Sequence, residues 1–260
     1  MTGDIKMGTL DGKVAFITGA ARGMGRAHAV KLASEGADII AIDVCAEFDS
    51  TDYPGATTDD LATTVRLVER QGRRILARQA DVRDGDAVDA VVAEGLQEFG
   101  RLDIVLGNAG IIRVSDTDRR RQTFRDVVEV NLIGAWNTVD AAIPALIAGG
   151  RGGSIVLTSS TQGIKASGTD RAGLQGYAAS KRALVALAQG WALQLAPHSI
   201  RVNTIHPSGV ATDMIINETT MALAAAGDAW LATQQNALPI ALVQPEIGRA
   251  SCRERVCHNV

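Results

Sequence analysis

The chain of 260 residues has little cysteine, little excess charge and no long apolar run. Its three cysteines are too few and too scattered for a disulfide framework, which favours a reducing compartment. A formal net charge of −3 supplies no field that would draw the whole molecule to nucleic acid or to an anionic membrane. No stretch approaches the ~18 consecutive apolar residues of a membrane-spanning helix, and the first residues lack the apolar core of a signal peptide. These absences predict a soluble, cytoplasmic protein without a membrane span.

Short apolar runs alternate regularly with segments of helical periodicity along the chain. We expect strands within residues 13–19, 37–44, 73–82, 102–110, 153–160 and 199–207, with helices between them. Apolar strands alternating with helices are typical of a parallel sheet that is covered on both faces. The sequence therefore predicts one α/β domain, a Rossmann-type doubly wound parallel sheet, over residues 1–245. Two stretches, 45–57 and 167–173, have the composition of loops, and long loops in compact domains are usually functional or mobile.

A glycine-rich segment, TGAARGMG (18–25), lies between the first predicted strand and the first helix. Gly19, Gly23 and Gly25 would let backbone N–H groups approach a pyrophosphate at the start of the helix. The spacing differs from the common G-x-G-x-x-G, and a tight turn without a ligand would need the same glycines. The position favours dinucleotide binding, because doubly wound sheets bind dinucleotides at this junction.

Asp43 ends the second predicted strand, close to the ~20-residue offset at which an acidic residue takes the adenosine ribose hydroxyls. A carboxylate there would repel the 2′-phosphate of NADP, whereas Arg22 in the glycine-rich segment would attract a phosphate. Asp43 is fixed by the end of a strand and Arg22 is free to turn toward solvent, so we predict NAD. The alternative for Asp43 is a helix cap or a solvated strand end.

The motif YAASK (177–181) places Tyr177 and Lys181 four residues apart, on one face of a predicted helix. A free phenol has a pKa near ~10 and is a poor base at neutral pH, and a nearby ammonium group favours its ionised form. The pair alone is weak evidence, because tyrosine and lysine at this spacing are common on solvated helices.

Further motifs, ADV (80–82), NAG (108–110), VVEVNLIG, IVLTSS and IRVNTIHPSGVAT, follow in order. With them the chain resembles the short-chain dehydrogenase/reductase family over residues 12–245. The resemblance implies an NAD-dependent oxidoreductase acting on alcohols, with the catalytic residues Asn131, Ser160, Tyr177 and Lys181. It implies cofactor contacts at Gly19, Arg22, Gly23, Met24, Gly25, Asp43, Asp81, Val82, Asn108, Ala109, Gly110, Tyr177, Lys181, Pro207, Gly209, Val210 and Thr212.

The resemblance also implies a role for each catalytic residue. Ser160 would orient the substrate oxygen, Tyr177 would take the alcohol proton, Lys181 would hold ribose hydroxyls, and Asn131 would anchor a water. Ser160 lies seventeen residues before Tyr177, a few more than the family commonly has. We expect the extra residues in the loop 167–173, and Ser159 is the alternative serine.

A closer resemblance is to the mycofactocin-coupled, carveol dehydrogenase-like branch of that family. It rests on GKVAFITGAARGMGRAHAV, on an insertion around 45–57, on RGGSIVLTSS and on NALP (236–239). It implies a small apolar, secondary or terpenoid-like alcohol, and an NAD that stays bound and is reoxidised in place by mycofactocin. The alternatives are an ordinary dehydrogenase or 3-oxoacyl-type reductase that exchanges NAD(P), a non-catalytic NAD-sensing module, and a lyase or epimerase.

Residues 210–238 are rich in apolar side chains, which would suit either core packing or, as the resemblance implies, a lid over an apolar substrate. The arginine run 119–121 has no interleaved aromatic residues and is typical of a solvated helix start, so no nucleic-acid partner is expected. The histidines share no ligand spacing with cysteines or acidic residues, and we predict no metal site.

The segment EIGRASCRERVCHNV (246–260) differs from the rest of the chain. Cys252, Cys257 and His258 lack a fourth ligand and the usual zinc spacing. The segment resembles the translated read-through of a sequencing adapter, so we interpret it as a non-native tail that replaces a last helix and an edge strand. The family resemblance implies a homo-oligomer, a tetramer, when the native C-terminus is present. We expect the chain as written to fold poorly or to aggregate.

Overall fold

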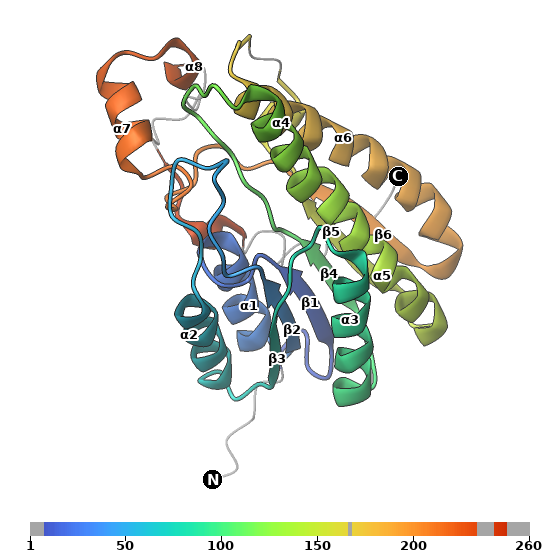
Figure 1. Cartoon of the computed structure of the whole chain (residues 1–260). Coiled ribbons are helices and arrows are strands. Elements are labelled where there is room, and N and C mark those ends of the chain that lie inside the picture. Colours follow the sequence, from blue (N-terminus) through green and yellow to red (C-terminus); the bar gives the residue numbers. More distant parts are fainter. Residues whose placement is uncertain (1–7, 166–167, 233–241, 249–260) are drawn as a thin grey trace.

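A parallel six-stranded sheet forms the centre of the computed structural model, which describes residues 8–165, 168–232 and 242–248 (Figure 1). The strands are β1 (Val14–Thr18), β2 (Asp38–Asp43), β3 (Ile75–Gln79), β4 (Ile104–Gly107), β5 (Gly153–Thr158) and β6 (Ile200–Ile205). They lie in the order β3-β2-β1-β4-β5-β6, so the sheet grows in one direction from β1 and then in the other from β4. This confirms the predicted Rossmann-type fold, and it places the topological switch point between β1 and β4.

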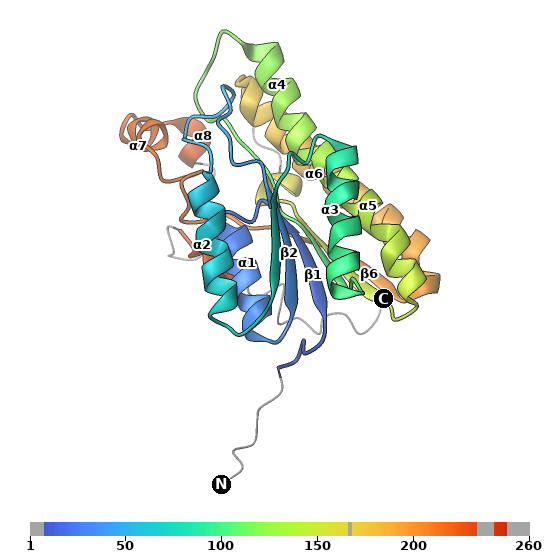
Figure 2. The same ribbon diagram turned by 60° about the horizontal axis from the view of Figure 1, so that its bottom comes forward.

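Helices cover both faces of the sheet. They are α1 (Gly23–Ser34), α2 (Thr58–Glu69), α3 (Gly85–Phe99), α4 (Arg120–Val128), α5 (Gly134–Gly149), α6 (Ala172–Leu195), α7 (Glu218–Ala225) and α8 (Ala229–Ala232), with the short helical turns η1 (Glu129–Ile133), η2 (Thr161–Gly163), η3 (Ala196–His198) and η4 (Pro245–Gly248). Figure 2 shows α1 and α2 on one face and α3, α5 and α6 on the other. The α7–α8 segment and the loop after β2 lie beyond one end of the sheet (Figure 1).

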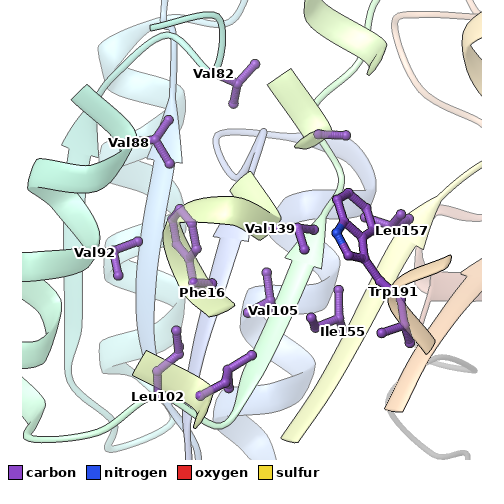
Figure 3. Close-up of a cluster of buried hydrophobic side chains, with 14 of the residues drawn as sticks. Phe16, Val82, Val88, Val92, Leu102, Val105, Val139, Ile155, Leu157 and Trp191 are labelled. Atoms are coloured by element: carbon purple, nitrogen blue, oxygen red, sulfur yellow. The ribbon is translucent and has the colours of Figure 1, made fainter. Parts of the chain in front are cut away.

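Two apolar clusters fill the spaces between the sheet and its helices. Alternate residues of β1 belong to different clusters: Phe16 faces α3 and α5, and Ile17 faces α1. Figure 3 shows the larger cluster, in which Trp191 of α6 reaches the side chains of β5. Every residue of β1 and β2 is buried, which explains why both strands are continuous apolar runs in the sequence.

Between β4 and β5 the helices α4 and α5 are joined by η1, a π-helical turn. Asn131 lies in this turn and is fully buried. Its Oδ1 accepts a hydrogen bond from Ile111 N at 2.7 Å, and its Nδ2 donates to Ile111 O at 2.8 Å. The wide turn thereby fixes the chain that leaves β4, and π-turns of this kind are frequent at functional sites.

The helical run from Arg120 to Gly149 is long and apolar enough to cross a membrane, with a mean hydropathy of 1.3 in its most apolar window. In the structure α4 packs against α6, and α5 packs against α3 and β4. A third of that window, 33%, is buried inside the domain. The run packs against the α/β domain along part of its surface, and a single run of this kind is weak evidence for a membrane span.

Two predictions about the end of the chain lie partly outside the residues that the structure describes. Within the described ranges, β6 is the last strand of the sheet, and a single bridge joins Val210 to Val243. Residues 249–260, and with them most of the predicted non-native tail, fall outside, as do residues 233–238 of the predicted lid. The predicted boundary at residue 245 falls within η4, which lies against α1. The tail and the missing strand remain predictions.

Candidate functional site

A cavity of about 430 Å³ lies at the carboxyl ends of the strands, at the switch point between β1 and β4. Its wall is built from the glycine-rich turn after β1, the loop after β2 and the segments that follow β3, β4, β5 and β6. Open α/β sheets bind their ligands at this position. The cavity therefore collects side chains that are far apart in the sequence.

The glycine-rich turn has a geometry that requires glycine. Gly19 has φ of 66° and Gly23 has φ of 55°, which are left-handed values. A Cβ on Gly25 would stand 2.0 Å from Gly19 O, so α1 could not start so close to the turn with a larger residue. Asn108 Nδ2 donates to Thr18 O at 3.1 Å and to Gly19 O at 3.2 Å. The turn is thus a rigid cradle of the kind that fits a dinucleotide pyrophosphate.

Asp43 ends β2 beside this cradle, and its side chain is buried. One carboxylate oxygen accepts from Ala21 N at 2.9 Å and the other accepts from Cys45 N at 3.1 Å. Each oxygen keeps a lone pair for a further donor. Asp43 is therefore held as the sequence predicts, and it also supports the glycine-rich turn, which the sequence does not reveal.

Arg22 turns toward protein groups. Its Nη1 pairs with Asp213 Oδ2 at 2.8 Å, and its Nη2 donates to Pro54 O. Asp213 belongs to the segment that follows β6, and Pro54 belongs to the loop after β2. Arg22 lines the cavity and joins these two segments, so the expectation from the sequence that it is free to turn toward solvent is wrong.

Tyr177 and Lys181 lie on α6, and both line the cavity. Lys181 Nζ is 5.5 Å from the centre of the Tyr177 ring, and it donates to Thr158 O at 2.7 Å. Burial lowers the pKa of Lys181 to about 8. Burial also raises the pKa of Tyr177, against the opposing effect of a hydrogen bond with Ser160. The sequence predicts a lowered pKa for Tyr177. In the structure this pKa is raised, because the loss of hydration outweighs the hydrogen bond with Ser160.

The two candidate serines have different partners. Ser159 Oγ donates to Lys181 O at 2.8 Å, so its hydroxyl is used in holding α6. Ser160 Oγ accepts from Gln162 N at 3.2 Å and lies within hydrogen-bonding reach of Tyr177. The geometry favours Ser160 as the serine beside Tyr177. The turn η2 follows directly; of the loop 167–173 that was predicted to hold the extra residues, Ser167 lies outside the described part of the chain and α6 begins at Ala172.

Most of the predicted site residues line the cavity, and four do not. Those in the wall are Gly19, Arg22, Gly23, Met24, Asp43, Asp81, Val82, Asn108, Ala109, Gly110, Tyr177, Lys181, Pro207, Val210 and Thr212. Gly25 lies beneath Gly19, and Gly209 O accepts from Val243 N at 2.9 Å. Asn131 is enclosed behind Gly110, and Ser160 lies behind the wall beside Tyr177. Of these four, Ser160 is the one that lies within hydrogen-bonding reach of a side chain in the wall, that of Tyr177.

Sequence reasoning missed several residues of the wall, among them Phe48, Thr51 and Tyr53 of the loop after β2. This loop is docked firmly. The Asp52 carboxylate accepts from Val114 N at 2.7 Å, from Ser115 N at 2.8 Å and from Ser115 Oγ at 2.5 Å. The length and composition of 45–57 marked a functional loop, but only the packing shows which of its side chains face the cavity.

Comparison with known proteins agrees with this geometry. The model of the family described as short chain dehydrogenase matches residues 13–223. The (−)-trans-carveol dehydrogenase of Rhodococcus erythropolis is 47% identical over 216 residues, which are 82% of this chain and 76% of the relative.

The crystal structure of carveol dehydrogenase from Mycobacterium avium in complex with NAD is similar with a TM-score of 0.86 and 42% identity, over 94% of this chain and 90% of that chain. That of a short chain dehydrogenase from Mycobacterium paratuberculosis bound to NAD has a TM-score of 0.87 and 45% identity, over 94% of this chain and 91% of that chain. With its parallel sheet, its glycine-rich turn and its Tyr177–Lys181 pair, the chain belongs to the short-chain dehydrogenase family.

Proposed function

We propose that the protein is an NAD-dependent oxidoreductase that interconverts a secondary or terpenoid-like alcohol and its carbonyl. The observation that carries this proposal is that Tyr177 and Lys181 line the same cavity as the glycine-rich turn, with Ser160 within hydrogen-bonding reach of Tyr177. An acid–base group and a dinucleotide cradle in one cavity suit hydride transfer at a carbon that bears oxygen. The relatives named as carveol dehydrogenases support the class of substrate.

The cradle fits NAD by its chemistry. Backbone N–H groups of the turn at Gly19 and Gly23 would hold the pyrophosphate, and Asp43 would accept from the adenosine ribose hydroxyls. Asp81, Val82 and Lys181 also line the cavity, where Asp81 and Val82 would contact the adenosine and Lys181 would hold ribose hydroxyls near the nicotinamide. When bound, NAD supplies the acceptor for the hydride of the alcohol carbon.

The residues of the chain would handle the proton and the orientation of the substrate. Ser160 would donate a hydrogen bond to the substrate oxygen and so hold it near Tyr177. Tyr177 would take the hydroxyl proton during oxidation and return it during reduction. Since burial raises the pKa of Tyr177, this step needs positive charge close by, which Lys181 supplies while it is protonated. Asn131 fixes the backbone at Ile111 and Gly110, next to Lys181 Nζ.

We further propose that the NAD stays bound between turnovers and is reoxidised in place, with mycofactocin as the electron acceptor. The support for slow release is that Arg22 bonds both to Pro54 and to Asp213 and would thereby close the mouth of the cavity. The alternative is an ordinary dehydrogenase or 3-oxoacyl-type reductase, which exchanges its NAD(P) and needs no mycofactocin.

The test is to denature the purified protein and identify the released nucleotide, and then to assay native protein on a panel of alcohols with an artificial electron acceptor. We expect one NAD per chain and oxidation of cyclic secondary alcohols without added NAD. Exchange of labelled NAD within seconds would contradict the bound-cofactor proposal and leave an ordinary dehydrogenase. Protein with no affinity for NAD, or with bound NAD that no alcohol reduces, would contradict the proposed function as a whole.

A further inference from the structure

Tyr53 is one of only two tyrosines in the chain, and both line the same cavity. Tyr177 comes from α6, whereas Tyr53 comes from the loop after β2, more than a hundred residues earlier. The two rings belong to one apolar cluster, together with Ile112, Trp230 and Met214. Tyr53 therefore bounds the part of the cavity next to the proposed acid–base group, where the substrate has to lie.

The Tyr53 hydroxyl accepts one hydrogen bond and is able to donate another. Its oxygen accepts a hydrogen bond from Ile112 N at 3.2 Å. A phenol accepts and donates at the same time, and among the described residues none accepts from the Tyr53 O–H. Buried polar groups in native proteins are nearly always paired, with protein, water or ligand. Burial raises the pKa of Tyr53, so the hydroxyl keeps its proton and remains a donor across the neutral range.

The surroundings hold Tyr53 in place. Thr51 Oγ1 donates to Tyr53 O at 2.9 Å, and the neighbouring Asp52 carboxylate is bound by the backbone at Val114 and Ser115. The Asp52 side chain is only 4% exposed, and Arg113 Nη2 pairs with it at 3.5 Å. A donor that is fixed in this way loses little freedom when a ligand accepts from it, which makes it suited to select between ligands.

We propose that Tyr53 is a specificity-determining residue whose O–H donates a hydrogen bond to a second, non-reacting oxygen of the alcohol substrate. The inference rests on the proposed function and narrows its substrate class. The preferred substrate has a compact apolar skeleton, which contacts Ile111 and Met214 in the cavity wall, and an ether, hydroxyl or carbonyl oxygen apart from the reacting hydroxyl. An alcohol without the second oxygen leaves the buried donor unpaired and reacts more slowly.

Matched alcohols test this assignment with the NAD-loaded protein and an artificial electron acceptor. The 2-, 3- and 4-methoxycyclohexanols carry an ether oxygen that accepts a hydrogen bond and is not oxidised, and the ethylcyclohexanols replace this oxygen by a methylene group. The measure is the ratio of kcat/KM for the two members of each pair. For at least one pair we expect the ratio to favour the methoxy alcohol in the wild type and to fall about tenfold in Tyr53→Phe, the size expected for a lost buried hydrogen bond.

A control variant separates the hydroxyl from general packing. Leu231 packs in the same cluster as Tyr53 and is absent from the cavity wall, so Leu231→Ala should slow both members of a pair alike and leave the ratio unchanged. If Tyr53→Phe does not fold, Tyr53→Met, which also lacks the hydroxyl donor, replaces it in the same measurement. Unchanged ratios for all three pairs, or an equal loss for both members, would overturn the inference and leave the proposed function intact. A wild type with bound NAD that oxidises none of the six alcohols and no other alcohol would overturn both.

Discussion

Lys181 Nζ lies 5.5 Å from the centre of the Tyr177 ring, one helical turn along α6, and donates to Thr158 O at 2.7 Å. Lys181 keeps only 3% of its surface exposed, because the ends of β4 and β5 enclose it. The pair is thus anchored to the sheet and not to solvent. This anchoring sets the protonation of the pair and its distance from the glycine-rich turn.

Replacing Tyr177 by phenylalanine removes the proposed acid–base hydroxyl and leaves the ring in place. We expect alcohol oxidation to fall by a factor of ~10² to 10⁴, the usual contribution of a positioned proton donor or acceptor. Nucleotide content should stay at the wild-type level, because the glycine-rich turn and Asp43 are untouched. Steady-state kinetics and the nucleotide released on denaturation measure the two quantities. Turnover equal to the wild type would remove Tyr177 from the mechanism.

The two adjacent serines provide a matched comparison. Ser160→Ala should lower kcat by about 10²-fold, because the substrate oxygen and Tyr177 lose a shared partner. Ser159→Ala should have a much smaller effect on kcat, but it should lower the free energy of unfolding by about 1 kcal/mol, since Lys181 O loses the donated hydrogen bond at 2.8 Å. Kinetics and urea unfolding of both variants distinguish the roles. The opposite order of kinetic effects would make Ser159 the reacting serine.

The stability of the nucleotide-free protein should depend on pH through Lys181. Burial lowers its pKa from 10.5 to about 8, so between these values the unfolded chain holds a proton that the folded chain has released. The free energy of unfolding therefore rises with pH in this window, by at most about 1.4 kcal/mol per pH unit, and the gain is absent below it.

Urea unfolding at pH 7, 8, 9 and 10 measures this dependence, with Lys181→Met as the reference that cancels all other titrating groups. We expect the wild type to gain stability relative to Lys181→Met as the pH rises from 8 to 10. A constant difference between the two proteins would mean that Lys181 keeps an ordinary pKa in the folded state.

Asp43→Asn should relax the discrimination against NADP. The substitution removes the negative charge that would face a 2′-phosphate, while its amide oxygen still accepts from a backbone N–H such as that of Ala21. We expect the ratio of the Kd values for NADPH and NADH to fall about tenfold, as measured by nucleotide fluorescence on stripped protein. Asp60→Asn is the control, because Asp60 also lines the cavity but is paired with Arg26. An equal change in both variants would argue against a specific role for Asp43.

Arg22→Ala should speed the release of NAD. The guanidinium group joins Pro54 O to Asp213 Oδ2 across the cavity mouth, and without it the two segments separate more readily. We expect exchange of labelled NAD to accelerate about tenfold, the effect of losing roughly 1.4 kcal/mol of closure. Arg119→Ala is the matched control: Arg119 pairs with Asp49 of the same loop at 2.9 Å but is absent from the cavity wall. Equal exchange rates in the wild type and Arg22→Ala would show that Arg22 does not close the mouth.

The sequence predicted the layout of the fold because its signals are local. Buried strands such as β1 appear as continuous apolar runs, and the glycine-rich turn between β1 and α1 needs residues without side chains. Spacing within one helix placed Tyr177 and Lys181 on one face. The sequence failed where a contact joins two segments: Asn131 in the π-turn at Glu129–Ile133 bonds to Ile111, twenty residues earlier, and no periodicity reveals this.

The sequence by itself determined the parallel sheet, the glycine-rich turn, Asp43 at the end of β2 and the Tyr177–Lys181 pair, because each follows from residues within one element or one junction. Only the tertiary structure decided which serine faces Tyr177, that Arg22 bridges two loops, and that Tyr53 shares a cavity with Tyr177. These relations join side chains from different elements and loops. They depend on how loops pack over the carboxyl edge of the sheet, and composition and spacing carry no record of that packing.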